Sequence, residues 1–152
     1  MNNLTKVDYL TELAQCIESP RYFIETYCQI YDGESSDWVP FVLWREQVDV
    51  LHAVHKHNKV VALKARQLGM TWLLGDAYPL WLMLFRPAAT ILLFSKRDDE
   101  AVYLLGEERF RGTYKRLPDW IKAGRTITRN DAHVFAFSNG SVARAFPTPA
   151  GD

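Results

Sequence analysis

Residues 59–72 read Lys59-Val60-Val61-Ala62-Leu63-Lys64-Ala65-Arg66-Gln67-Leu68-Gly69-Met70-Thr71-Trp72. The run over residues 59–63 is short, apolar and β-branched, which is typical of a buried strand. A loop over residues 64–69 follows, and a helix is expected from Met70 or Thr71 to about Leu84. A loop that joins a buried strand to a helix N-terminus presents backbone N–H groups to an anion. This segment therefore predicts a strand, an anion-binding loop and a helix.

Helices are expected on the N-terminal side of this unit. Apolar residues recur at spacings of three and four over residues 6–31, and Ser19-Pro20 is a helix-start signal that divides the run. Residues 32–37 are polar and contain glycine, so they predict a loop. Another helix is expected at about residues 44–57. The first 36 residues are therefore interpreted as an N-terminal helical segment.

On the C-terminal side, a second buried strand is expected at residues 90–94 and a helix at residues 98–111. Three further strands are expected at residues 126–128, 133–137 and 141–146, with a hairpin turn at 138–141. An extended segment is expected from Pro147 to Asp152. The alternation of strands and helices predicts an α/β fold with a mainly parallel sheet and helices on both faces, in three αβα layers.

Composition narrows the class of protein. The 152 residues are 48% hydrophobic and 13% aromatic, with a formal net charge of zero. A globular core is expected, whereas a global positive field that would attract DNA is excluded. The apolar run over residues 73–94 contains Asp76, Pro79, Arg86 and Pro87, so no membrane span is expected. Two cysteines and no signal peptide predict a soluble, intracellular protein.

The loop departs from the standard phosphate-binding pattern G-x-x-x-x-G-K-[ST]. Gly69 and Thr71 occupy the second glycine and the hydroxyl position, but Lys64 replaces the first glycine and Met70 the lysine. Two unit charges 4 Å apart in a partly buried site interact by about 4 kcal/mol, so a triphosphate needs a cation here. We interpret Lys64 as that cation, displaced to the front of the loop, with Arg66 as a second. The alternative is that both are solvated charges.

Residues 64–72 resemble the Walker A segment of the large terminase subunits of tailed phages, which commonly show an Arg-Gln-x-Gly core. Trp44-Arg45-Glu46-Gln47 resembles the adenine-recognising glutamine motif of that family. The resemblance implies a P-loop NTPase fold that binds ATP and Mg²⁺, with Thr71 as the metal ligand and Lys64 and Arg66 in catalytic roles. The implied nucleotide-binding residues are Trp44, Gln47, Lys64, Ala65, Arg66, Gln67, Leu68, Gly69, Met70, Thr71 and Trp72.

The resemblance also implies a role for the parent protein. Residues 37–152 would be a partial ATPase domain that stops before the Walker B strand, so hydrolysis by this chain alone is not expected. The parent would be an ATPase with an endonuclease domain, which translocates DNA into a procapsid and cuts concatemers in the host cytoplasm. Its partners would be double-stranded DNA, the small terminase subunit, the portal and other copies of itself. The alternatives are a helicase-like DNA-dependent ATPase and a non-hydrolytic assembly module with a degenerate loop.

Overall fold

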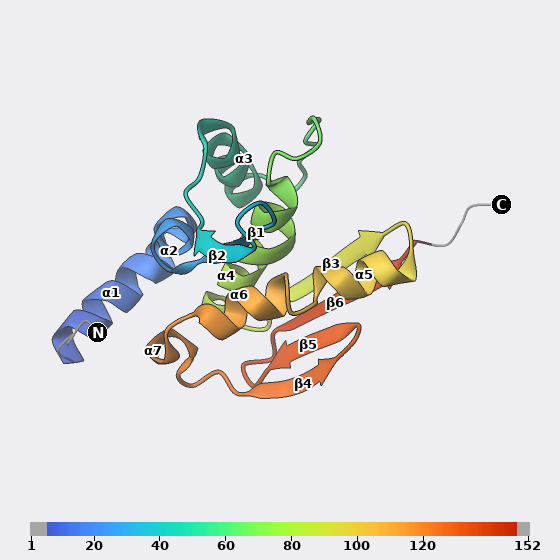
Figure 1. Cartoon of the computed structure of the whole chain (residues 1–152). Helices are drawn as coiled ribbons and strands as arrows, with labels where there is room; N and C mark the ends of the chain where they lie inside the picture. Colours follow the sequence, from blue (N-terminus) through green and yellow to red (C-terminus); the bar gives the residue numbers. More distant parts are fainter. Residues whose placement is uncertain (1–5, 149–152) are drawn as a thin grey trace.

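A computed structural model describes residues 6–148 of the chain (Figure 1). Helices dominate the first half, and a four-stranded sheet occupies the second half. The elements are α1 (Lys6–Glu18), α2 (Pro20–Tyr27), β1 (Gln29–Asp32), β2 (Asp37–Pro40), α3 (Arg45–Lys56), the π-helical segment η1 (Trp72–Ala77), α4 (Tyr78–Phe85), β3 (Thr90–Ser95), α5 (Asp98–Leu104), α6 (Phe110–Arg116), α7 (Asp119–Lys122), β4 (Ile127–Asp131), β5 (Val134–Phe137) and β6 (Val142–Pro147).

The N-terminal helices break where the sequence predicts. Ser19 caps α2, because its hydroxyl accepts a hydrogen bond from the backbone N–H of Tyr22 at 3.1 Å. The expected helix over residues 6–31 is wrong beyond Tyr27, however. Residues 29–32 form β1, which pairs antiparallel with β2 through the predicted loop. The backbone N–H and C=O groups of residues 29–32 form hydrogen bonds with β2 instead of within a helix. Strand pairing therefore overrides the helical periodicity of the sequence.

The strand expected at residues 59–63 is absent. This segment has no regular structure, and Val61 and Leu63 are 97% and 101% exposed. A strand needs a neighbour for its N–H and C=O groups, and no backbone hydrogen bond joins these residues to another segment between residues 6 and 148. The apolar pattern therefore predicted a buried strand wrongly, because it carries no information on whether a pairing partner is present.

The helix expected from Met70 or Thr71 is confirmed, and it continues to Phe85. Its middle is π-helical over residues 72–77, immediately before Pro79, which has no N–H to donate to the preceding turn. This helix is the centre of the hydrophobic core. Trp81 is fully buried, and its indole N–H donates to the carbonyl of Cys16 at 2.7 Å, which ties α4 to α1.

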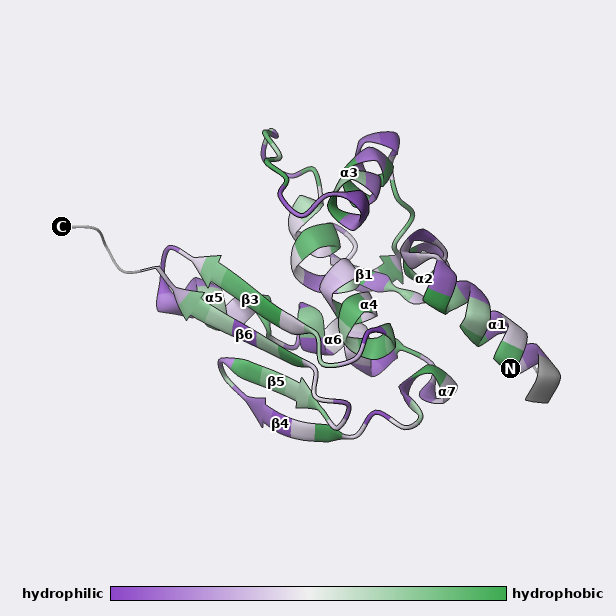
Figure 2. Cartoon of the chain, turned by 180° about the vertical axis from the view of Figure 1, so that it is seen from behind, coloured by the Kyte–Doolittle hydropathy of each residue, from purple (hydrophilic) through white to green (hydrophobic). Residues whose placement is uncertain are grey.

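The C-terminal sheet is mixed rather than mainly parallel. Its strand order is β3-β6-β5-β4, and only the β3–β6 pair is parallel. Figures 1 and 2 show α5 and α6 on one face, whereas no described helix covers the opposite face. The described part therefore has two layers here, not the expected three. Because side chains alternate along a strand, Leu92 and Phe94 of β3 are 51% and 60% exposed, so β3 is not the buried strand expected.

Of two further predictions, the turn between β5 and β6 is confirmed, and the single helix at residues 98–111 is wrong. The turn at residues 138–141 is confirmed: it joins β5 to β6, and Gly140 adopts a φ of 85°. The single helix expected at residues 98–111 is instead split into α5 and α6 around Gly106. The expected C-terminal extended segment lies outside the described residues from position 149 onward. Every helix between residues 6 and 148 is too short or too polar to cross a lipid bilayer.

Candidate functional site

Two adjoining cavities flank the loop that the sequence singles out. The loop cavity, of about 660 Å³, is lined by Lys64, Thr71 and Arg109 together with the β1–β2 turn. The aromatic cavity, of about 580 Å³, is lined by Phe41, Trp44 and Gln47 among others. Both cavities share the following residues: Asp32, Glu34, Gln67, Leu68, Gly69 and Trp72. Together they form one cleft, and the aromatic cavity is the more apolar part of it.

The loop turns sharply into the helix through two left-handed residues. Gln67 and Gly69 have φ values of 62° and 63°. A Cβ atom on Gly69 would lie only 2.7 Å from Nε2 of Gln47, so a side chain at this position would be both strained and obstructed. Glycine is therefore required at position 69 by backbone conformation and by the close approach of α3.

The helix that follows presents unpaired backbone donors to the loop cavity. The first intrahelical bond runs from the N–H of Leu73 to the carbonyl of Gly69 at 3.2 Å. The N–H groups of residues 70–72 precede it and have no helical acceptor. The Thr71 side chain is exposed at the same place, and its hydroxyl makes no hydrogen bond within the described part of the chain. These groups and the helix dipole together favour an anion.

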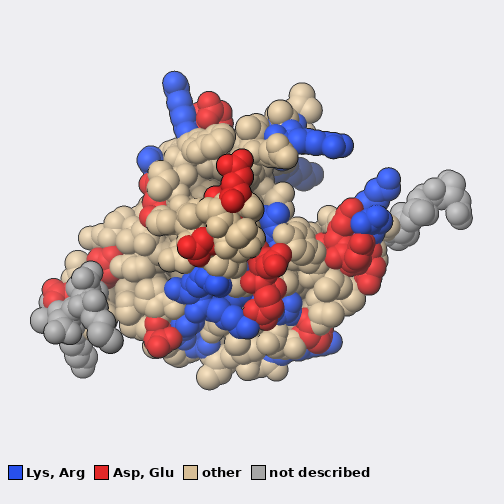
Figure 3. All heavy atoms as spheres, in the orientation of Figure 1, with Lys and Arg blue, Asp and Glu red and all other residues tan. Residues whose placement is uncertain are grey.

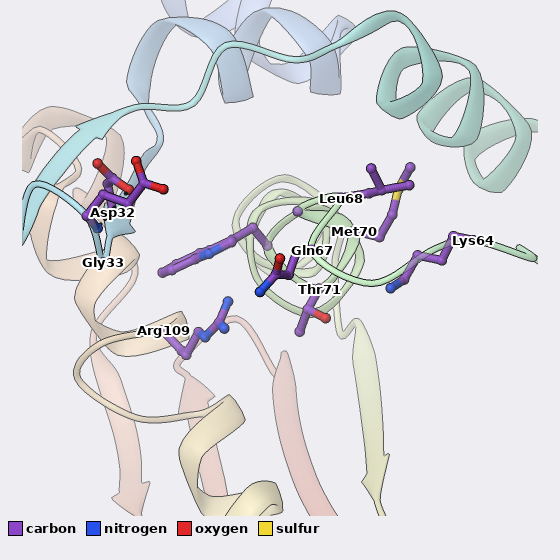
Figure 4. A pocket seen from close by; sticks show the side chains of 11 residues that line it. Asp32, Gly33, Lys64, Gln67, Leu68, Met70, Thr71 and Arg109 are labelled. Atoms are coloured by element: carbon purple, nitrogen blue, oxygen red, sulfur yellow. Dashed lines mark hydrogen bonds between the residues drawn. The ribbon is translucent and has the colours of Figure 1, made fainter.

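The cations predicted for the loop differ in their placement. Lys64 lines the loop cavity, and within the described residues its amine donates only to the carbonyl of Ala65, at 3.3 Å. Figure 4 shows Lys64 at the end of the cavity opposite Asp32, with Gln67 and Thr71 between them. Arg66 and Ala65 are exposed and line neither cavity. Of the two predicted cations, only Lys64 therefore faces the cleft.

Met70 does not take the place of the usual lysine. It is 6% exposed and belongs to the hydrophobic core. In Figure 4 it lies beside Leu68, away from the amine of Lys64. The residue that departs from the standard pattern thus packs the helix start against the rest of the protein.

Gln47 couples the aromatic cavity to the loop. It is 4% exposed, its amide nitrogen donates to the carbonyl of Leu68 at 3.0 Å, and its oxygen accepts from the backbone N–H of Trp44 at 3.0 Å. One amide hydrogen and one lone pair remain for a ligand. Trp44 is 58% exposed, so its ring is available to stack on a planar group.

Two carboxylates that the sequence did not assign to the site lie on the β1–β2 turn. Asp32 accepts hydrogen bonds from the backbone N–H of Ser35 at 3.1 Å and from its hydroxyl at 2.7 Å. These bonds hold the pKa of Asp32 below its ordinary value, so it remains ionised. With Glu34 it balances the positive charges of Lys64 and Arg109 in the loop cavity. Nothing in the polar loop sequence indicates that it folds over the cleft.

Arg109 is the other site residue that the sequence analysis missed. It lies between α5 and α6, and Figure 4 shows its guanidinium pointing into the loop cavity. A signal for it existed, because Asp76 stands within an apolar helix and an ionisable residue in that position requires a buried partner. That partner is Arg109, whose Nη1 lies 3.9 Å from Oδ2 of Asp76.

Charge on the outer surface is mixed. Figure 3 shows basic side chains gathered over α6 with acidic side chains beside them.

No family model matches the sequence, and a search of curated proteins returned no match.

Proposed function

We propose that the cleft binds ATP with Mg²⁺, with the base in the aromatic cavity and the phosphates in the loop cavity. The observation that carries this proposal is the junction of the two cavities at residues 67–69. A more apolar cavity with aromatic side chains next to a more polar one suits a ligand that is planar at one end and anionic at the other. Gln47 lines the aromatic cavity, bonds to Leu68 at the junction, and keeps an unused donor and acceptor for the edge of a base.

The residues of the loop cavity define the roles in this proposal. The N–H groups of residues 70–72 and Lys64 bind the phosphates, and Trp44 stacks on the base. The hydroxyl of Thr71 is unpaired and faces the same cavity, which fits a magnesium ligand. Because Asp32 and Glu34 also line the cavity, a bare polyphosphate would be repelled. We therefore expect binding to depend on Mg²⁺, which supplies the missing positive charge.

In the wider proposal, the chain is the ATP-binding part of a large terminase subunit. The parent would couple ATP hydrolysis to DNA translocation, with double-stranded DNA, the small subunit and the portal as partners. The support is the resemblance of residues 64–72 and 44–47 together with the position of both segments on one cleft. A helicase-like ATPase would use the same cleft.

One observation favours a second candidate, the non-hydrolytic assembly module. Val61 and Leu63 are fully exposed, so the segment before the loop is not held in a sheet as a phosphate-loop strand would be. Apolar side chains exposed in an extended segment are typical of a surface that binds another chain.

Calorimetric titration with Mg-ATP tests the proposal. Lys64→Ala should weaken binding by about 10-fold or more, since a charge-assisted hydrogen bond contributes about 1.5–3 kcal/mol. Lys59→Ala is the matched control, because Lys59 is an exposed lysine on the same segment and lines neither cavity. Met70→Leu keeps the core packed and should leave the affinity nearly unchanged. Absence of binding by the wild type, or equal affinities for Lys64→Ala and Lys59→Ala, would refute the assignment.

A further inference from the structure

Arg109 reaches the cleft from outside the segments that resemble a known motif. Its guanidinium lies 4.2 Å from the ring centre of Trp72 and 5.2 Å from that of Tyr103. The side chain is 19% exposed, and its exposed part lines the loop cavity. Two aromatic rings therefore hold this cation in place at the side of the cavity.

Asp76 lies beneath Arg109 and is fully buried. Its two carboxylate oxygens and the Nε and Nη1 atoms of Arg109 are buried without hydrogen-bond partners among the described residues. The separation of 3.9 Å is longer than a hydrogen bond. Burial raises the pKa of Asp76 well above its ordinary value, and the charge of Arg109 offsets part of that rise. Nη2 is not among these buried unsatisfied atoms, and Arg109 lines the loop cavity.

This arrangement is a poor structural ion pair. Desolvating two charges costs several kcal/mol per ion, and only close contact with full hydrogen bonding offsets that cost. Here the partners stop short of contact, and four polar atoms remain unsatisfied. Buried unsatisfied groups in a folded protein call for an explanation, and ligand binding is one of the ordinary explanations. The exposed edge of the guanidinium supplies the direction in which the ligand would lie.

We propose that Arg109 is a second cationic anchor for a polyphosphate, on a different element from Lys64, and that Asp76 and Trp72 position it. This inference rests on the proposed nucleotide site and names the part of the ligand that Arg109 recognises. A planar guanidinium matches the oxygens of a phosphate group, and stacking on Trp72 lowers the entropy lost when the contact forms. The contact discriminates by phosphate number, because only the polyphosphate end of a nucleotide enters the loop cavity.

The test compares Mg-ATP, AMP and inorganic tripolyphosphate with Mg²⁺ in calorimetric titrations. Arg109→Gln removes the charged guanidinium that lies over Trp72 and leaves a shorter, neutral side chain. We expect it to weaken Mg-ATP and tripolyphosphate binding by about 10- to 100-fold and AMP binding by less than about twofold. Arg109→Lys should recover part of the loss. Arg116→Ala is the matched control, because Arg116 stacks on Trp38 at 3.7 Å but lines neither cavity, and it should leave all three affinities unchanged.

The outcomes separate this inference from the proposed function. Wild-type binding of ATP that Arg109→Gln leaves intact overturns the role of Arg109 alone. Binding of tripolyphosphate but not ATP, lost in Arg109→Gln, overturns the nucleotide proposal and supports the anion site. Binding of neither ligand overturns both.

A measurement on the wild type keeps the proposal falsifiable if Arg109→Gln does not fold. Phenylglyoxal modifies arginine, and mass spectrometry reports its rate at each peptide. Tripolyphosphate with Mg²⁺ should slow modification at Arg109 and not at Arg116. Equal rates with and without tripolyphosphate at Arg109 would overturn the proposal.

Discussion

Replacing Gly69 by alanine should destabilise the protein, whereas the same change at Gly75 should not. Gly69 has a φ of 63°, and a Cβ there would meet Nε2 of Gln47 at 2.7 Å. Gly75 lies in η1, has no positive φ, and its Cβ would meet only a methyl group of Thr71 at 3.5 Å. These glycines are six positions apart on one segment, so each serves as the control for the other.

The magnitude follows from two costs. A left-handed backbone costs alanine about 1–2 kcal/mol. Moving Gln47 breaks its hydrogen bond to the Leu68 carbonyl, which costs about 1 kcal/mol. Gly69→Ala should therefore lower the free energy of unfolding by about 2–3 kcal/mol. Gly75→Ala should raise it by up to about 1 kcal/mol, because alanine is the better helix former and the contact is ordinary.

Urea unfolding followed by tryptophan fluorescence measures both effects. Gln47→Ala and the double variant complete a cycle that isolates the contact between residues 47 and 69. Because the double variant removes the obstruction but keeps the backbone strain, the coupling should be about 1 kcal/mol. A Gly69→Ala protein within about 0.5 kcal/mol of wild type, or a Gly75→Ala protein less stable than Gly69→Ala, would refute this account of the loop.

Three further predictions concern the surrounding structure. Arg111 is 8% exposed and donates hydrogen bonds to the side chain of Asn130 and to several backbone carbonyls. Arg111→Lys should therefore lower the free energy of unfolding by about 2–3 kcal/mol in urea titrations, and an unchanged unfolding midpoint would contradict this. Two tyrosine hydroxyls donate to Glu12 and lower its pKa from the ordinary value of 4.5. Wild type should therefore be more stable than Glu12→Gln above pH 4.5, and this difference in the free energy of unfolding should disappear as the pH falls through the lowered pKa of Glu12. A stability difference that grows in acid would contradict the prediction. Threonine at Val61 or Leu63 should change stability by less than about 0.5 kcal/mol, since both are fully exposed, and a thermal-melt loss of 1 kcal/mol or more would mean that the segment is buried in solution.

The sequence predicts local features of this fold better than its pairings. The Ser19-Pro20 break, α3, the helix after the loop and the turn at residues 138–141 depend on nearby residues, and all are confirmed. Periodicity cannot reveal which strand pairs with which. It therefore missed β1 and the parallel neighbour of β3, and it placed a strand at residues 59–63, which pair with no other described segment.

For the candidate site, too, local features could be predicted from the sequence, whereas contacts made by the tertiary fold could not. The loop and the helix start could be predicted because a glycine and a hydroxyl are close in sequence, whereas Gln47 was predicted only from the family resemblance, and Ala65 and Arg66 line neither cavity. Asp32 and Glu34 could not be predicted, and Asp76 indicated a buried partner without identifying it as Arg109. These residues reach the cleft from the β1–β2 turn and from the segment between α5 and α6, and only the tertiary fold brings those two segments to the loop.

The two proposed phosphate anchors differ in how well they are held before a ligand arrives. Arg109 is fixed by two rings and a buried carboxylate. Lys64 follows a segment without backbone hydrogen bonds to any other described segment, and the hydrogen bond of its amine within residues 6–148 goes to the carbonyl of the next residue. Ordering a lysine side chain and the segment behind it consumes part of the free energy that its charge contributes, whereas a preorganised arginine retains more of it. Loss of Arg109 should therefore weaken polyphosphate binding more than loss of Lys64. If a partner strand ordered residues 59–63, less entropy would be lost when Lys64 binds the phosphates, and the effects of losing Arg109 and Lys64 on affinity would become similar. Binding of a partner to the exposed segment and binding of polyphosphate in the cleft would then strengthen each other.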